Sequence, residues 1–283
     1  MILVFGKTGQ AGCELARRAE VVTLDRAAAD LTDPDVCATA ISVRQPSAVI
    51  NAAGWTAVDK AEDNEAEATV VNGVAPDARA RACAALCIPF VHLSTDYVFD
   101  GTGTSPWQPG DKTEPLVVYG RSKLMGEQGV AAAGGIHAIV RTSWVFSAHG
   151  ANFVKTMLRL GVRCESLNVV ADQIGGPTPA GHIAEACLAI AGALAIRPHL
   201  SGIYHLSGAP DVSWADFARA IFVEAGLACT VNDIPSSAYP TPARRPSNSR
   251  LDCSSLREAF GIGRADWRRG LVSVLGELKR GSS

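Results

Sequence analysis

Short, mostly apolar runs alternate with longer helical segments through the first half of the chain. Each run is bounded by turn residues or charges, which is typical of buried parallel strands. This alternation predicts an α/β fold with a Rossmann-like, doubly wound parallel sheet. We expect strands at Ile2–Phe5, Val21–Leu24, Ala48–Ile50, Phe90–Leu93 and Ala138–Val140, and helices at Gln10–Ala19, Pro34–Val43, Glu65–Leu86 and Ser122–Ala132.

The second half is less regular and predicts a smaller α/β lobe, interleaved with the sheet and joined to it without a clean linker. Tyr239–Pro246 is rich in proline and arginine and cannot form a regular helix. We expect helices at Asn152–Leu160, Pro179–Ala195, Trp214–Ala225, Cys253–Phe260 and Ala265–Leu278, and strands at Leu167–Val170 and Ile203–His205.

The composition is that of a soluble globular protein, since 47% of the 283 residues are apolar and 19% are charged. A net charge of −2 gives no overall positive field to attract nucleic acid or a membrane. No apolar stretch approaches the ~20 residues of a spanning helix, and we expect no signal peptide before the first strand. Eight scattered cysteines favour reduced thiols and a cytoplasmic protein.

A glycine-rich segment, Gly6–Gly12 (GKTGQAG), follows the first strand and opens the first helix. Glycines in such a turn let the backbone approach a pyrophosphate at the helix N-terminus. The G-x-x-G-x-x-G spacing resembles that of the short-chain dehydrogenase/reductase superfamily. The same glycines fit a simple tight turn, but their position between strand and helix favours a dinucleotide site.

The end of the second strand gives conflicting signals about the cofactor. Asp25 can accept hydrogen bonds from the adenosine ribose, which favours NADH. Arg26 can instead pair with the 2′-phosphate of NADPH. The cofactor is therefore predicted as NADPH or NADH.

Tyr119 and Lys123 form a Tyr-x-x-x-Lys pair at the start of a predicted helix. Residues four apart share one helical face, so the phenol and the ammonium can address one site. Ketone reduction needs a proton for the oxygen. A nearby ammonium and the positive charge of the nicotinamide should pull the pKa of the phenol down from ~10. Upstream, Ser94 or Thr95 would bring a hydroxyl to the same carbonyl.

These motifs together resemble the dTDP-4-dehydrorhamnose reductase family, within the extended short-chain dehydrogenase/reductase superfamily. The resemblance implies NAD(P)H-dependent reduction of the 4-keto group of dTDP-4-dehydro-6-deoxy-L-mannose to dTDP-L-rhamnose, for cell-surface polysaccharide synthesis. Matching segments span nearly the whole chain: Phe5–Gly12, Asn51–Glu62, Ser94–Phe99, Val118–Glu127, Arg141–Val145, Asn152–Leu160, Asp172–Thr178 and Tyr239–Leu251.

The resemblance also implies roles for individual residues. Thr95, Tyr119 and Lys123 would be catalytic, Thr95 and Asp96 would contact the sugar, and Trp144 would pack on the substrate. With the glycine loop, the cofactor-binding set is Gly6, Thr8, Gly9, Gln10, Ala11, Gly12, Asp25, Asp30, Leu31, Ala53, Gly54, Trp55, Thr56, Leu93, Tyr119 and Lys123.

Three arginines in or near the proline-rich segment are candidates for the nucleotide end of the substrate. Arg244, Arg245 and Arg250 offer guanidinium groups that match diphosphate oxygens. The alternative is a basic surface loop. Asn152 and Lys155 are further candidates for this cleft.

Some members of the resembled family bind magnesium at a dimer contact through acidic residues. Glu14 matches one of them, but the second-half positions here are Gly181 and His182. We therefore predict no metal and expect Glu14 to be a solvated helix acid.

Residues 1–146 are predicted to form the dinucleotide-binding domain, with part of 161–200 returning to it, and 147–283 mainly the substrate lobe. The expected partner is a dTDP-linked 4-keto-6-deoxy sugar, with no nucleic acid and no membrane, in a monomer or homodimer. The rivals are another nucleotide-sugar 4-ketoreductase or epimerase, and a non-catalytic NADP-binding regulatory subunit. An intact Tyr119 and Lys123 argue against the last.

Overall fold

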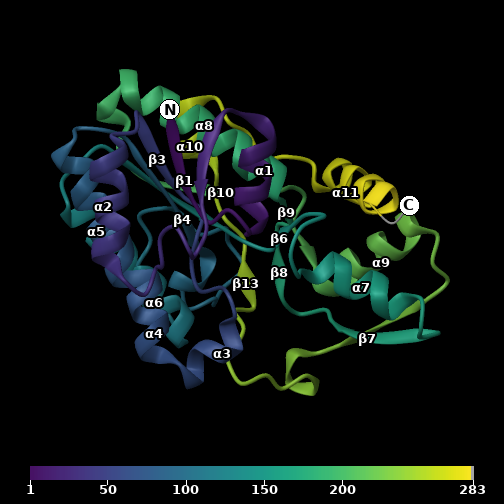
Figure 1. Ribbon diagram of the computed structural model, residues 1–283. Helices are drawn as coiled ribbons and strands as arrows, with labels where there is room; N and C mark the ends of the chain where they lie inside the picture. The colour runs from purple at the N-terminus through teal and green to yellow at the C-terminus, as the bar shows by residue number, and fades with distance from the viewer. Residues whose placement is uncertain (282–283) are drawn as a thin grey trace.

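The computed structural model describes residues 1–281, and its larger part is built on a six-stranded parallel sheet (Figure 1). The strand order is β2-β1-β3-β4-β5-β10. From β1 the chain adds β2 on one side and then β3 and the later strands on the other, so the strand order reverses between β1 and β3. The strands are β1 Ile2–Phe5, β2 Val21–Leu24, β3 Ala48–Asn51, β4 Phe90–Thr95, β5 His137–Thr142 and β10 Gly202–Leu206. The five strands predicted in the first half are therefore confirmed, each within two residues.

Helices cover both faces of this sheet, which explains why its strands are apolar on both sides. On one face, Val4, Ile50 and Val91 pack with helices α1 (Gln10–Arg18), α8 (Ala180–Ile196) and α10 (Ser254–Phe260). On the other, Leu3, Val49 and Phe90 pack with α2 (Pro34–Arg44), α5 (Ala75–Ala85) and α6 (Val118–Ala132). Neighbouring residues of each strand thus enter opposite cores, as the predicted doubly wound fold requires.

The helix predicted over Glu65–Leu86 is interrupted. It consists of α4 (Glu65–Thr69), a π-helical turn over Val70–Val74, and α5. A further short helix, α3 (Val58–Asp63), precedes it and was not predicted. Helix α6 also begins one turn earlier than expected, which places Tyr119 inside its first turn.

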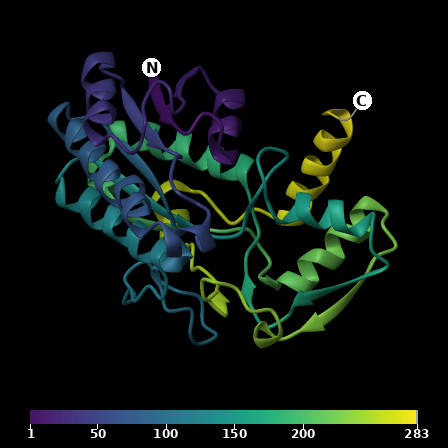
Figure 2. The same ribbon diagram turned by 60° about the horizontal axis from the view of Figure 1, so that its bottom comes forward.

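A smaller lobe lies to one side of the sheet, on the right in Figures 1 and 2. Its core unites three helices with a two-stranded parallel ribbon. These elements are α7 Phe153–Gly161, α9 Trp214–Ala225, α11 Trp267–Gly281, β7 Ser166–Val170 and β12 Thr230–Ile234. Strand β12 was not predicted, because it carries polar side chains and lies at the edge of the ribbon, where most of them are exposed.

Short pairings connect the two parts. Strand β6 pairs with β9, and β8 pairs with both β11 and β13. Within residues 1–281, no helix is both long and apolar enough to span a membrane. The short elements are β6 Val145–Phe146, β8 Ile174–Gly175, β9 Thr178–Pro179, β11 Val212–Ser213 and β13 Asn248–Ser249, with 3₁₀ turns at Asp96–Val98, Pro198–Leu200 and Ser236–Ala238.

Candidate active site

A cavity of about 740 Å³ opens at the carboxyl ends of the sheet strands. Ligands of open α/β sheets bind at this edge, beside the point where the strand order reverses. The predicted cofactor residues that line it are Gly6, Thr8, Gly9, Gln10, Ala11, Asp25, Asp30, Leu31, Ala53, Gly54, Trp55, Thr56, Leu93, Tyr119 and Lys123, and the predicted substrate residues are Thr95, Asp96, Trp144 and Asn152.

The glycine loop needs its first and last glycine for steric reasons. Gly6 has φ +108°, and a Cβ there would lie 2.8 Å from the Ala52 carbonyl carbon. A Cβ on Gly12 would lie 1.9 Å from the Gly6 carbonyl oxygen, so Gly12 packs behind the loop rather than lining the cavity. No side chain in the described structure caps the N-terminus of α1 at Gly9, which leaves backbone N–H groups free for an anion. The loop therefore fits a dinucleotide pyrophosphate.

Charged side chains of both signs stand at the end of the cavity formed by β1 and β2. The Lys7 ammonium lies 3.3 Å from the Asp25 carboxylate, and Arg26 pairs with Asp30 at 3.1 Å. A hydrogen bond from the Ala28 backbone N–H, and next the one from the Lys7 ammonium, lower the pKa of Asp25. Asp25 is therefore an ionised acceptor, while Lys7 is a second cation whose possible role was missed from the sequence.

Tyr119 and Lys123 both point from α6 into the cavity and are buried. Burial raises the pKa of Tyr119 to about 12, and a hydrogen bond with Thr95 opposes the rise. Burial lowers the pKa of Lys123 to about 8, and its Nζ donates to the Leu93 carbonyl oxygen at 2.6 Å. The expected lowering of the Tyr119 pKa relied on Lys123 together with the nicotinamide's charge. In the protein by itself the pKa is raised instead, because desolvation of the phenol dominates. The phenol is protonated, as a proton donor must be.

Thr95 and Asp96 lie side by side at the end of β4. The Thr95 hydroxyl accepts from the Tyr97 backbone N–H and donates to Asp96 Oδ1, both at 3.2 Å. Burial raises the pKa of Asp96 to about 6, against hydrogen bonds from Ser249 and Thr95. These side chains share the wall of the cavity with Tyr119.

An aromatic stack forms the side of the cavity towards the smaller lobe. The rings of Trp144 and Trp214 stack at 3.5 Å with an interplanar angle of 11°, and both residues line the cavity. Trp144 has φ +50°, a left-handed backbone that is rare for a bulky side chain and typical of constrained functional positions. Trp214 was not predicted as a site residue, because the sequence pattern places it only as the first apolar residue of the helix predicted over Trp214–Ala225.

The remaining predicted substrate residues do not line the cavity. Lys155 Nζ donates to the Ala148 carbonyl oxygen at 3.3 Å. Arg245 pairs with Asp59 at 2.6 Å, Arg250 donates to Asn248 Oδ1 at 3.0 Å, and Arg244 is exposed. None of the three arginines therefore lines the cavity in this structure.

Comparison with known proteins gives the family. The RmlD substrate binding domain family matches residues 1–280. A dTDP-4-dehydrorhamnose reductase from Sinorhizobium fredii is 46% identical over 94% of this chain and 93% of its own length. The chain belongs to the dTDP-4-dehydrorhamnose reductase family.

Solved structures of the dTDP-4-dehydrorhamnose reductase family agree in fold. The Clostridium acetobutylicum reductase superposes with a TM-score of 0.91 at 33% identity, covering 98% of this chain and 99% of that one. The Bacillus anthracis reductase, solved in complex with NADP, has a TM-score of 0.91 at 31% identity, covering 98% of both chains. The predicted α/β fold and family are thereby confirmed.

One buried residue that organises the cavity of this family member was missed from the sequence. Asn72, in the π-helical turn, accepts from the Trp55 backbone N–H at 2.8 Å and donates to the Trp55 carbonyl oxygen at 3.1 Å. It also donates to Ser122 Oγ of α6 at 3.0 Å. The amide thus ties the loop after β3 to the helix that carries Tyr119. π-helical turns often mark functional sites, but no sequence period reveals them.

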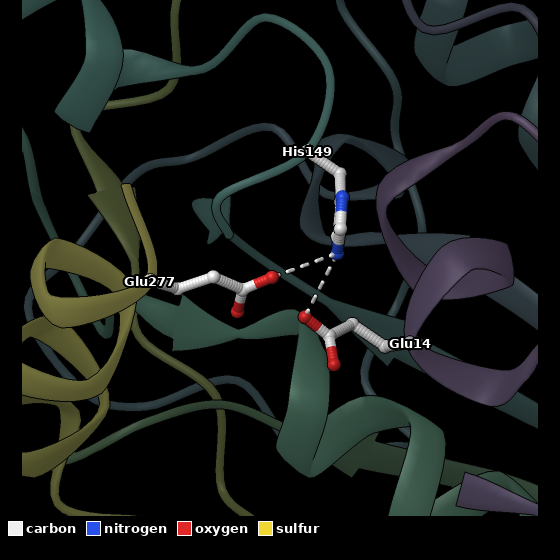
Figure 3. Close-up of side chains that lie close together, drawn as sticks. All are labelled: Glu14, His149 and Glu277. Atoms are coloured by element: carbon white, nitrogen blue, oxygen red, sulfur yellow. Dashed lines mark ion pairs between the residues drawn. The ribbon is translucent and has the colours of Figure 1, made fainter. Parts of the chain in front are cut away.

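The expectation that Glu14 is solvated is wrong, since it is only 5% exposed. Its carboxylate pairs with Arg18 and lies 3.5 Å from His149 Nε2, which lies 3.6 Å from Glu277 (Figure 3). Arg17 pairs with Glu277 and lies 3.9 Å from Glu14, and 3.3 Å from His149 Nε2.

Glu14, His149 and Glu277 are close enough to hold a metal ion. However, the Arg17 guanidinium contacts all three of these groups. Beside them, a Cβ at Gly181 would lie 2.5 Å from the Arg18 guanidinium, so Arg18 occupies the space next to this position. Arginines thus supply the positive charge at Glu14, and this arrangement does not fit the magnesium site of the resembled family.

Proposed function

We propose that the chain catalyses NAD(P)H-dependent reduction of the 4-keto group of dTDP-4-dehydro-6-deoxy-L-mannose, giving dTDP-L-rhamnose. The observation that carries the proposal is the meeting of Thr95, Tyr119 and Lys123 with the glycine loop in one cavity. Membership of the dTDP-4-dehydrorhamnose reductase family supports the choice of sugar.

In this mechanism Tyr119 is the general acid. Its raised pKa keeps the proton on the phenol until a carbonyl oxygen accepts it. Thr95 lines the cavity with Tyr119, and its hydroxyl would polarise the same oxygen. Reduced nicotinamide, when bound, supplies the hydride for the carbonyl carbon.

We assign Lys123 to holding the nicotinamide ribose. Its Nζ is anchored by the Leu93 carbonyl at the end of β4 and keeps further donors for ribose hydroxyls. The glycine loop would hold the pyrophosphate. Asp25, Lys7 and Arg26 would meet the adenosine ribose, with acceptor and cations that suit either cofactor.

The two parts of the fold divide the substrates between them. We assign the dinucleotide to residues 1–146 with part of 161–200, in which α8 packs on the sheet. Strand β10 also joins the sheet and lies beyond the predicted returning segment. The sugar would lie between Asp96 and Trp144, towards the smaller lobe. The three arginines stay candidates for the diphosphate only if the proline-rich segment moves towards the cavity on binding.

The test is a screen of the purified chain with NADH and NADPH against a panel of 4-keto nucleotide sugars, with products identified by NMR. We expect the dTDP-linked sugar to be reduced to dTDP-L-rhamnose. A different sugar or stereochemical outcome would favour another ketoreductase or an epimerase. Cofactor binding without turnover of any sugar would favour a regulatory subunit.

A further inference from the structure

Two stacked indoles form the wall of the cavity towards the smaller lobe. Trp144 follows strand β5 of the sheet, and Trp214 is the first residue of α9 in the smaller lobe. Their ring centroids lie 3.5 Å apart, and the ring planes differ by 11°. Phe153 of α7 also packs on Trp214, with the centroids 4.6 Å apart. The core of the smaller lobe therefore supports Trp214, and Trp214 in turn covers one face of Trp144.

The Trp144 ring is held by close contacts with its neighbours. Its backbone is left-handed, with φ +50°. This conformation is unfavourable for a bulky residue and persists only where the surroundings impose it. A Cβ on Gly175 of β8 would lie 2.9 Å from the indole Cε2, so this glycine makes room for the ring. The orientation of Trp144 in the cavity is therefore set by Gly175 together with the stack on Trp214.

The two stacked indoles also keep their ring N–H groups free. The other three of the five tryptophans each donate to a backbone carbonyl oxygen: Trp55 to Ala57 at 3.0 Å, Trp107 to Asn248 at 3.2 Å and Trp267 to Pro210 at 2.8 Å. Within residues 1–281, Trp144 and Trp214 donate to no other residue. Both line the cavity, so both donors are available to a ligand there.

The stack stands beside the reacting end of the cavity. Thr142, the last residue of β5, is paired in the sheet with Thr95 of β4, and Trp144 follows two residues later. All three residues line the cavity. A sugar whose keto carbon meets Thr95 and Tyr119 therefore has the stack next to its ring. An indole offers an apolar face to the C–H side of a sugar and an N–H to a hydroxyl.

We propose that Trp214 determines specificity for the sugar ring of the substrate. It fixes the plane of Trp144 through the stack, and it adds a second indole N–H for a sugar hydroxyl. The inference rests on the proposed function, because it takes the sugar to lie between Asp96 and Trp144. Trp214 thereby serves binding of the sugar, and not binding of the nucleotide or transfer of the proton.

Two substitutions separate the stack from the donor. Trp214→Phe keeps an aromatic ring and removes the N–H, whereas Trp214→Leu removes the aromatic face as well and still fills much of the space. Losing one hydrogen bond or one aromatic pair typically weakens binding about 2- to 10-fold. We expect KM for the 4-keto sugar to rise by about this factor in Trp214→Phe and by a further factor of the same size in Trp214→Leu. The fall in kcat should be smaller in both.

Binding of dTDP-L-rhamnose and of dTDP alone, measured by isothermal titration calorimetry, locates the effect. Affinity for dTDP-L-rhamnose should fall in the same order as KM rises, whereas affinity for dTDP, which lacks the hexose, should change much less. Trp107→Phe is the matched control, because it removes an indole that bonds Asn248 and does not line the cavity. Its KM for the sugar should stay at the wild-type value. Cofactor affinity and urea unfolding report whether each variant keeps its fold.

An unchanged KM for the sugar in Trp214→Leu would overturn the inference. An equal loss of affinity for dTDP and for dTDP-L-rhamnose would also overturn it, since the stack would then lie at the nucleotide. A parallel loss of cofactor affinity in Trp214→Phe would make Trp214 a structural residue. If Trp214→Leu does not fold, Trp214→Phe decides through the same comparison of the two ligands. If the wild-type chain neither binds dTDP-L-rhamnose nor reduces its 4-keto precursor, the proposed function itself fails, which is a different result from a working wild type with an unaffected variant.

Discussion

Burial sets the chemistry of the candidate site residue by residue. Tyr119 and Lys123 are recognisable in the sequence by spacing alone, yet desolvation moves their pKa values apart, to about 12 for the phenol and about 8 for the ammonium. Both groups are thereby held closer to their neutral forms than in water. The sequence could predict which groups meet, but not the environment that decides their protonation.

Replacing Tyr119 with Phe removes the proton donor and keeps the ring. We expect kcat to fall by about 10²–10⁴, with cofactor affinity unchanged, because the general acid is lost and packing is retained. Nicotinamide oxidation and cofactor titration measure the two effects. Tyr204→Phe is the matched control, since that hydroxyl bonds only the Leu200 carbonyl outside the cavity. Near-normal turnover of the Tyr119 variant would show that Tyr119 is not the general acid.

Asp25 should influence which nicotinamide cofactor is preferred. Asp25→Ala removes the ribose acceptor and frees Lys7 from its ion pair, so a 2′-phosphate gains a cation and loses a repelling carboxylate. We expect the ratio of kcat/KM for NADPH to that for NADH to rise. Asp35→Ala, an exposed acid of α2, should leave the ratio alone. An unchanged NADPH-to-NADH ratio of kcat/KM in the Asp25 variant would show that Asp25 does not contact the adenosine ribose.

At the scale of elements, the hydrophobic pattern predicted the strands that are buried on both faces and missed strand β12, which is largely exposed. The first five sheet strands are apolar runs, and all were found. Strand β12 is polar because only one ribbon partner and one helix cover it, so no run marks it. The π-helical turn at Val70–Val74 leaves the helical composition intact and shifts only the backbone bonding. Contacts made by single amides, such as Asn72, have no periodic signal.

Asn72 should matter more for the cofactor than for the proton. Asn72→Ala leaves the Trp55 backbone N–H and carbonyl without their side-chain partner, at a cost of about 1–3 kcal/mol for a buried unsatisfied group. The Ser122 hydroxyl loses one donor but keeps its bond to the Tyr119 carbonyl. We expect weaker cofactor binding and lower stability, with a smaller change in kcat. Urea unfolding and cofactor titration test this. Asn64→Ala, which loses one exposed bond to Lys60, is the control.

At the scale of the whole molecule, helix α1 links the two parts of the fold. Gln10 donates to the Val145 carbonyl and accepts from Ser147 and Asn152, while Arg17 reaches Glu277 of α11. Sequence analysis missed this link because the partners lie more than a hundred residues apart. The glycine loop runs into the N-terminus of the same helix. Helix α1 therefore takes part both in the expected cofactor site and in the contact between the sheet and the smaller lobe.

The arginines beside Glu14 predict a reductase that needs no metal. We expect turnover to survive exhaustive EDTA treatment, because Arg17 and Arg18 already neutralise the carboxylates that a cation would bind. The measurement is steady-state nicotinamide oxidation before and after chelation, with added magnesium as the control. Activity that disappears with EDTA and returns with magnesium would show that a cation displaces these side chains.

The pairing of Arg17 with Glu277 should contribute measurably to docking of the smaller lobe. A double-mutant cycle of Arg17→Ala and Glu277→Gln isolates it. The Arg17 side chain is 49% exposed, so we expect a coupling of only about 0.2–1 kcal/mol in urea unfolding. The coupling should shrink as salt is raised, since exposed charges are screened. The Arg81–Asp77 pair, within one helix, is the control for an ion pair that joins no lobes. A zero coupling at low salt would mean that the contacts of Gln10 with Val145, Ser147 and Asn152, rather than this charge pair, hold the smaller lobe against α1.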